Sequence, residues 1–193
     1  MNPKIYLITG LMASGKSTVS DLLAKSIEKC VHLRGDVFRK MIITGRENMS
    51  ATPSAEAVRQ LYLRYKLTAD AAKSYFDNGF SVVIQDNYYG DELNRMINYL
   101  HKYPVEVVVL CPDVETIKER ERYREKTGYS GTNFNRPGFA ALLKEIEAGR
   151  VETIVVKDLS KMQTTPRIGF WLDNSNQTPQ QTAENILNAR KPV

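Results

Sequence analysis

The stretch that decides the fold is residues 4–29, KIYLITGLMASGKSTVSDLLAKSIEK. An apolar run over residues 5–8 has the length of a β-strand, and Gly10 ends it. Residues 10–17, GLMASGKS, then match the pattern G-x-x-x-x-G-K-[ST] in full. Apolar residues at helical spacing follow. The order strand, glycine-rich loop and helix is the one that a phosphate-binding loop requires.

The residue types in this loop suit the binding of a nucleoside triphosphate. Glycines let backbone N–H groups turn inward around an anion, where a Cβ would obstruct them. We expect Lys16 to reach the β- and γ-phosphates and the Ser17 hydroxyl to bind Mg²⁺. A purely structural turn is the alternative, and the complete order of elements argues against it. The predicted nucleotide-binding residues are Gly10, Leu11, Met12, Ala13, Ser14, Gly15, Lys16, Ser17 and Thr18.

Length and composition indicate one domain over residues 1–193 with an ordinary core, since 42% of the residues are hydrophobic. The net charge of +5 comes without a long Lys/Arg run, so the charge suits anionic nucleotides and does not require nucleic acid. Cys30 and Cys111 follow or end apolar runs, and we expect free, buried thiols. Without a signal peptide or a membrane-length apolar run, we expect a cytoplasmic protein.

A second strand is predicted over residues 30–33, and it leads into Asp36 and Arg39. Because parallel strands end at one edge of a sheet, Asp36 should lie near the nucleotide phosphates. There it can accept a proton from a hydroxyl that attacks the γ-phosphate, and Arg39 can hold the acceptor. The competing interpretation is that Asp36 only caps a helix.

A third strand over residues 80–84 leads into Asp86, Tyr88 and Tyr89. An apolar strand that ends in Asp is typical of a carboxylate that holds Mg²⁺, directly or through water, and it would also border the acceptor. A turn-capping Asp is the alternative. The two tyrosines are predicted at the mouth of the pocket, where Tyr88 would form an aromatic wall for the acceptor.

The remaining elements follow from periodicity and turn residues. We predict a polar loop over 44–54, a long helix from Pro53 that ends before Gly79, and a helix over 91–103. A fourth strand over 105–111 precedes a helix that starts at Pro112. We expect Arg59 and Arg64 of the long helix to be solvated and not bound to substrate.

Another pair of arginines follows the fourth strand. Arg120 and Arg124 share one helix face and can close over the transferring phosphate, although a solvated, salt-bridged face is the alternative.

Together these motifs resemble the small P-loop kinases, in particular the group with chloramphenicol phosphotransferase, zeta toxins and polynucleotide 5′-kinase domains. The likeness covers about residues 3–126 and 165–190. It implies a three-layer α/β P-loop NTPase fold, with a parallel sheet in the order 2-3-1-4-5, helices on both faces and a modified lid. It also implies that Asp36 assists the acceptor hydroxyl, that Arg120 and Arg124 neutralise the γ-phosphate, and that residues 173–177 contact adenine. A last strand over 168–172 and a final helix from Thr178 complete this fold.

Residues 127–162 are different, because they resemble a segment of serine recombinase catalytic domains. The resemblance does not imply recombination, since that family's nucleophilic serine lies near the start of its domain, where this chain has the phosphate loop. Lys161 also stands where that family has arginine. We expect a lid or insertion at 125–165. It should contain a helix over 139–148 and a strand over 153–156 that pairs at a sheet edge or in a dimer.

The sequence therefore favours an ATP-dependent phosphotransferase that uses Mg²⁺ and moves the γ-phosphoryl group to a hydroxyl of a small molecule or nucleotide. A nucleic-acid end is a less favoured acceptor, and we expect a monomer or homodimer with no membrane partner. The alternatives are a regulatory NTPase that phosphorylates no acceptor and a binding-only relic with a disabled lid. No guanine-specifying Asn-Lys-x-Asp motif is present, which argues against a GTPase.

Overall fold

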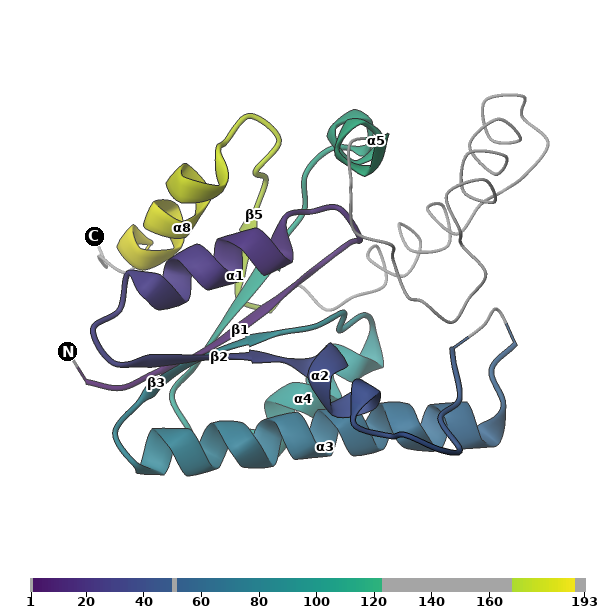
Figure 1. Ribbon diagram of the computed structural model, residues 1–193. Coiled ribbons are helices and arrows are strands. Elements are labelled where there is room, and N and C mark those ends of the chain that lie inside the picture. The colour runs from purple at the N-terminus through teal and green to yellow at the C-terminus, as the bar shows by residue number, and fades with distance from the viewer. Residues whose placement is uncertain (1, 50–51, 123–167, 190–193) are drawn as a thin grey trace, which may run out of the picture.

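The computed structural model describes residues 2–49, 52–122 and 168–189. The strands of these residues form one parallel sheet in the order β2-β3-β1-β4-β5 (Figure 1). This confirms the predicted α/β fold and its 2-3-1-4-5 strand order. The strands are β1 (Ile5–Gly10), β2 (Cys30–Arg34), β3 (Ser81–Gln85), β4 (Val105–Leu110) and β5 (Phe170–Leu172).

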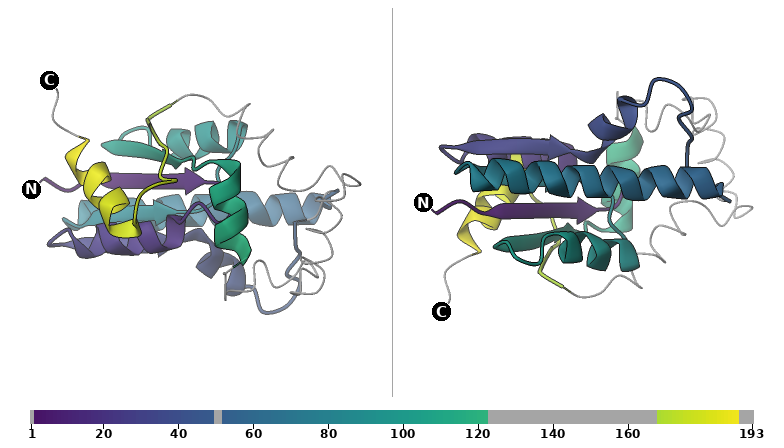
Figure 2. Two further views of the ribbon diagram at one scale, coloured as in Figure 1. Left: turned by 90° about the horizontal axis from the view of Figure 1, so that it is seen from above. Right: turned by 90° about the horizontal axis from the view of Figure 1, so that it is seen from below.

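Helices cover both faces of the sheet and make it the middle of three layers (Figure 1). α1 and α8 pack on one face, and α3 and α4 pack on the other. The short α2 and α5 lie at the end toward which the strands point (Figure 2). The helices are α1 (Lys16–Lys25), α2 (Gly35–Lys40), α3 (Ala55–Asp77), α4 (Asp91–Tyr99), α5 (Val114–Arg122) and α8 (Pro179–Asn188).

Burial on both faces explains why the strands are almost continuously apolar. All six residues of β1 are buried, and its side chains alternate between the two helical layers. Ile5 and Leu7 join the core with α3 and α4, whereas Tyr6 and Ile8 join the core with α1 and α8. This alternation fixes which residues at the ends of the strands face the phosphate loop.

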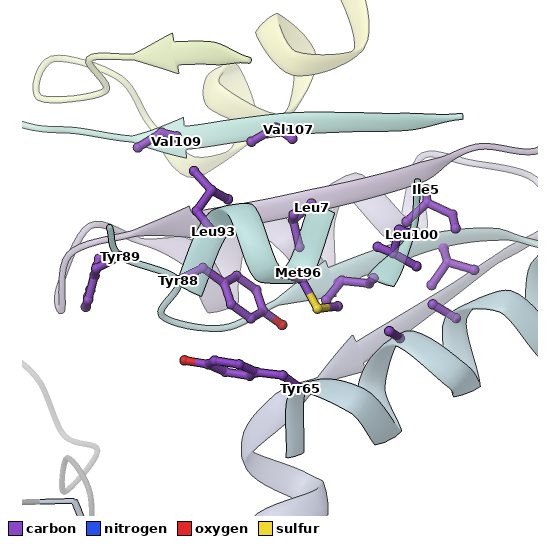
Figure 3. Close-up of a cluster of buried hydrophobic side chains, with 14 of the residues drawn as sticks. Ile5, Leu7, Tyr65, Tyr88, Tyr89, Leu93, Met96, Leu100, Val107 and Val109 are labelled. Atoms are coloured by element: carbon purple, nitrogen blue, oxygen red, sulfur yellow. The ribbon is translucent and has the colours of Figure 1, made fainter. Parts of the chain in front are cut away.

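The core between the sheet, α3 and α4 contains two tyrosines whose rings meet in a tilted contact (Figure 3). The ring centroids of Tyr65 and Tyr88 lie 4.9 Å apart, with an interplanar angle of 58°. Tyr88 is 0% exposed, so its predicted position at the mouth of the pocket is wrong. Its large apolar ring gains more from burial against Tyr65 than it would from forming an exposed wall.

Capping residues set the helix boundaries. α3 begins after Ser54, whose hydroxyl accepts a hydrogen bond from the Ala57 amide at 3.0 Å, so Pro53 lies just outside the helix. α8 begins with a complete capping box between Thr178 and Gln181. α4 ends at Tyr99, earlier than the predicted residue 103.

Several other predictions concern composition and the lid. Cys30 and Cys111 form no disulfide among the described residues, and both are half-buried where we expected full burial. Burial raises the pKa of Cys30 to about 11. No helix among the described residues is long and apolar enough to cross a membrane. The expected lid or insertion at 125–165, with its helix and strand, lies outside the described residues, as does Arg124.

We expect Leu93→Ala to lower the free energy of unfolding by about 2–5 kcal/mol, since it leaves a cavity in the core. Leu93 of α4 is 0% exposed and belongs to the core cluster that also contains Leu7 and Val109 (Figure 3). Urea denaturation measures the loss. The matched control is Leu63→Ala on α3, where the side chain is 39% exposed and we expect less than about 1 kcal/mol. Equal losses for the two variants would contradict this description of the core.

Candidate active site

The phosphate loop joins β1 to α1 and has a backbone shape that glycine permits. Gly10 has a φ of 145°, and a Cβ there would lie 2.3 Å from the Leu110 carbonyl oxygen. Gly15 has a φ of 93°. Both values lie in the region that side chains disfavour, so the two glycines of the motif are required by backbone geometry. Between them, Ala13 also has a positive φ, of 59°.

Lys16 is the first residue of α1, and its ammonium group lies inside the curve of the loop. Nζ donates hydrogen bonds to the carbonyl oxygens of Gly10 at 2.7 Å and Leu11 at 2.6 Å. The side chain is 7% exposed. A buried cation at a helix N-terminus creates a strongly positive potential that suits an anion. Ser17 beside it is half-buried and Thr18 is exposed.

The segment after β3 supports the first residue of this loop. The Tyr89 hydroxyl donates to the Gly10 carbonyl oxygen at 3.1 Å. The Thr9 hydroxyl donates to the Tyr88 carbonyl at 3.0 Å and accepts from the Tyr88 amide at 2.9 Å. Tyr89 is 8% exposed, so it acts as a brace beneath the loop and not as the predicted surface residue at the pocket mouth.

The opposite side of the loop is tied to α5 and to the segment after β5. Asn174 Nδ2 donates to the Ser14 carbonyl oxygen at 3.0 Å, and Arg120 Nη1 donates to the same oxygen at 3.4 Å. Arg120 Nη2 also donates to the Asn174 carbonyl at 2.8 Å. Arg120 therefore contacts the Ser14 part of the loop. Its proposed partner in neutralising the γ-phosphate, Arg124, lies outside the described residues.

Asn174 is a residue that the sequence did not single out. It is 2% exposed, and its Oδ1 atom has no hydrogen-bond partner among the described residues. The segment 173–177 was expected near adenine only by resemblance. Nothing in a short polar loop indicates which of its amides will be buried against the phosphate loop.

Asp36 lies in the first turn of α2, at the end of β2. Its carboxylate oxygens lie 3.1 Å from Lys40 Nζ and 3.5 Å from Arg34 Nε, and its side chain is 31% exposed. The N-cap residue of α2 is Arg34, so the interpretation of Asp36 as the N-cap is wrong. Its carboxylate remains accessible at the same edge of the sheet as the phosphate loop.

Arg39 and the loop 44–49 form a wall next to Asp36. Arg39 is 9% exposed, and its Nη1 donates to Asn48 Oδ1 at 2.6 Å. Gln60 of α3 holds the loop from below: its amide nitrogen donates to the Gly45 carbonyl at 2.8 Å, and its Oε1 accepts from the Glu47 amide at 2.9 Å. Two elements thus fix the loop at the position where we expect an acceptor.

Asp86 forms a buried ion pair with Arg64 of α3. The atoms Asp86 Oδ2 and Arg64 Nε lie 3.0 Å apart, and Arg64 Nη2 donates to Asp86 Oδ1 at 3.3 Å. The side chains are 5% and 4% exposed, so the prediction of a solvated Arg64 is wrong. The helical period places Arg64 on the buried face of α3, where its charge balances the carboxylate.

This geometry argues against Asp86 as a metal ligand. Both carboxylate oxygens face a guanidinium group within 3.3 Å, and Oδ1 also accepts from the Asn87 amide at 2.8 Å. A cation there would lie next to the Arg64 charge. In the described ranges no cluster of three or more His, Cys, Asp or Glu residues can hold an ion.

Gln85 is a second residue that sequence reasoning missed. It follows Val83 by two positions on β3, so it lies on the face of the sheet that α1 covers. It is also the register partner of Ile8. Its Oε1 atom is buried, and its side chain lies within hydrogen-bonding reach of the His32 imidazole on β2.

A phosphate loop between the first strand and the first helix, in a parallel sheet of order 2-3-1-4-5, defines the P-loop kinase fold. The sequence model of one family, described as AAA domain, matches residues 5–148, and the chain belongs to this AAA domain family. No curated protein matches the sequence significantly.

Solved structures of two kinases and of a tunicamycin resistance protein share this fold. A sugar kinase from Janibacter sp. HTCC2649, in an unliganded structure, is 18% identical with a TM-score of 0.64, over 96% of this chain and 93% of that chain. The APS kinase CysC of Mycobacterium tuberculosis, in complex with AMPPNP and APS, is 15% identical with a TM-score of 0.63, over 97% and 96% of the two chains. The tunicamycin resistance protein of Deinococcus radiodurans is 15% identical with a TM-score of 0.61, over 99% and 97%.

These matches bear on the resemblances read from the sequence. They confirm the likeness to P-loop kinases. The AAA domain match extends to residue 148, into the segment 127–162 that resembles serine recombinases. Neither the family match nor these three structures support that second resemblance, and the residues that carry it lie outside the described ones.

We expect Asn174→Ala to lower the free energy of unfolding by about 1–3 kcal/mol, because it removes a buried donor from the Ser14 carbonyl. The affinity for a non-hydrolysable ATP analogue should also fall, because the loop loses a contact that holds its shape. Thermal unfolding and calorimetry measure the two effects. The control, Asn185→Ala on α8, changes an exposed amide and should alter neither. Unchanged affinity in Asn174→Ala would show that the Asn174–Ser14 contact does not shape the loop.

Proposed function

We propose that this protein is an ATP-dependent phosphotransferase that moves the γ-phosphoryl group to a hydroxyl of a small molecule or nucleotide. The observation that carries the proposal is the juxtaposition of two opposite charges at one edge of the sheet. Lys16 lies inside the phosphate loop after β1, and Asp36 follows β2, with only β3 between these strands. A nucleotide held by Lys16 directs its terminal phosphate toward the side where Asp36 lies.

The proposed reaction assigns a role to each of these residues. Lys16 stabilises the negative charge on the β- and γ-phosphate oxygens, and Ser17 holds Mg²⁺, which neutralises charge on the same oxygens. Asp36 accepts the proton of the acceptor hydroxyl while that oxygen forms a bond to the γ-phosphorus. The bond between the γ-phosphorus and the β–γ bridging oxygen breaks, and ADP leaves.

Arg39 and the loop 44–49 are proposed to hold the acceptor beside Asp36. Arg39 is nearly buried yet belongs to the same short helix as Asp36, so its guanidinium group can bind a polar acceptor without entering the nucleotide site. The contact from Arg39 to Asn48 connects the arginine to the loop. The identity of the acceptor then depends on which group the loop leaves next to Arg39.

The kinase fold of the structural relatives supports this proposal over a binding-only role. ADP release measured with and without candidate acceptors separates the alternatives. Turnover that an acceptor stimulates supports the phosphotransferase, slow turnover that no acceptor changes indicates a regulatory NTPase, and no turnover indicates a relic. Mass spectrometry of sugars, antibiotics, nucleosides and 5′-hydroxyl oligonucleotides incubated with ATP would identify the acceptor by its gain of a phosphoryl group.

We expect Asp36→Asn to lower the rate of transfer by about 10²–10⁴-fold, because the amide cannot take the hydroxyl proton. Binding of an ATP analogue should be unchanged, since Asp36 lies outside the loop. The matched control is Asp91→Asn. Asp91 is exposed in the first turn of α4, so this variant should transfer phosphate at the normal rate. Normal transfer by Asp36→Asn would remove Asp36 from the mechanism.

Lys16→Ala should lower transfer by about 10²-fold or more, because the phosphates lose their main cationic partner. It should also weaken ATP binding, which calorimetry measures directly. Lys25→Ala is a suitable control, since this lysine lies in the last turn of the same helix with a side chain that is 70% exposed. If nucleotide affinity survives in Lys16→Ala, the loop is not the triphosphate site.

A further inference from the structure

The ion pair of Arg64 and Asp86 lies directly under the first residue of α2. A Cβ added to Gly35 would lie 2.0 Å from Asp86 Oδ2 and 2.8 Å from Asp86 Cγ. The carboxylate therefore occupies the space that any other side chain at position 35 would need. Gly35 is itself buried, so the contact is part of the interior and not a surface coincidence.

Contacts from α3 and from the next residue, Asn87, hold the Asp86 carboxylate in this position. Arg64 reaches it from α3 through two nitrogen atoms, at 3.0 Å and 3.3 Å. The Asn87 amide donates to Oδ1 at 2.8 Å, and the Asn87 carbonyl accepts from the Tyr65 hydroxyl at 3.0 Å. An ionised pair that is almost fully buried is costly to separate, because each charge would remain in a poorly solvating interior. The carboxylate is thus a rigid stop against which α2 packs.

The position of α2 matters because Asp36 is the residue after Gly35. A shift of the first turn of α2 moves the Asp36 carboxylate relative to the phosphate loop by a similar amount. Small displacements of a catalytic group cost much of its rate, since transfer needs the reacting atoms in contact and aligned. Arg39, one turn later, would move with it.

From this geometry we infer that Asp86, fixed by Arg64, is a positioning residue that sets the start of α2 through its contact with Gly35, and is not a metal ligand. The claim that Asp86 affects catalysis rests on the proposed role of Asp36. The claim that Asp86 sets the position of α2 does not, because the packing of α2 on Asp86 exists whether or not the protein transfers phosphate.

The claim that Asp86 sets the position of α2 is tested by hydrogen–deuterium exchange of residues 35–41 in a cycle of variants. Gly35→Ala leaves the ion pair intact but forces α2 away from Asp86, so its amides should exchange faster by about tenfold or more. The second background is Arg64→Met with Asp86→Ala, which removes both charges together and so avoids a lone buried ion. In that background Gly35→Ala should cause no further acceleration, because the carboxylate that it meets is gone.

Two internal comparisons keep this test decisive. Exchange in α8, on the other face of the sheet, should stay unchanged in every variant, which separates a local shift from global unfolding. Asp86→Asn keeps the shape of the side chain, so Gly35→Ala should still accelerate exchange there. Equal acceleration by Gly35→Ala in the background that lacks Asp86, or none in the normal chain, would overturn the positioning role.

The claim that Asp86 is not a metal ligand is tested by titrating Mn²⁺ into the protein with an ATP analogue. Electron paramagnetic resonance follows the free ion. The double variant Arg64→Met, Asp86→Ala, which leaves no unpaired buried charge, should keep Mn²⁺ affinity within about twofold of the normal chain, whereas Ser17→Ala should weaken it by about tenfold or more. A loss in the double variant as large as that in Ser17→Ala would restore Asp86 as a ligand.

The rate measurement separates this inference from the proposed function. If the normal chain transfers phosphate to an acceptor, Gly35→Ala should lower kcat by about tenfold or more at unchanged ATP affinity. An unchanged kcat would refute only the claim that Asp86 affects catalysis. If the normal chain transfers nothing, the proposed function fails. The exchange results still decide whether Asp86 positions α2, and the Mn²⁺ results still decide whether Asp86 is a metal ligand.

Discussion

The site depends on one interaction: the Lys16 ammonium group is held within the phosphate loop by the carbonyl oxygens of Gly10 and Leu11. A buried cation needs compensating oxygens, and in this chain the loop itself supplies them. The same Gly10 carbonyl accepts from Tyr89, and the Ser14 carbonyl accepts from Asn174. The loop is therefore braced at both ends by neighbouring elements. In the proposed function, phosphate oxygens would take the place of these carbonyl oxygens beside Lys16.

On the acceptor side, the polar side chains are fixed by pairing with one another. Arg64 holds Asp86, Gln60 holds the loop 44–49, and Arg39 bonds to Asn48. Gln60 and Arg64 lie on one face of α3. This face is therefore polar beside α2 and the loop 44–49, and apolar where it packs on the sheet. The long helix connects the hydrophobic core to the position of α2, and so to Asp36.

The sequence predicted the fold because its signals are local: the loop motif, the strand-length apolar runs and the helix caps each depend on neighbouring residues. Predictions that depend on tertiary pairing were less successful. Arg64 was expected in solvent, because a charge on an amphipathic helix is usually exposed, yet Asp86 compensates it in the interior. Tyr88 was expected at the surface because it follows β3. Nothing in the sequence pointed to Asn174 or Gln85, since the burial of their side-chain oxygens depends on elements far away in the chain.

The most direct test of the central claim is a crystal structure of the protein with a non-hydrolysable ATP analogue and Mg²⁺. We predict that the β- and γ-phosphates lie in the curve of residues 10–17, that Lys16 Nζ leaves the Gly10 and Leu11 carbonyls to contact them, and that the Asp36 carboxylate faces the terminal phosphorus. An analogue bound elsewhere, with Lys16 still bonded to its own loop, or Asp36 directed away from the terminal phosphate, would contradict the account.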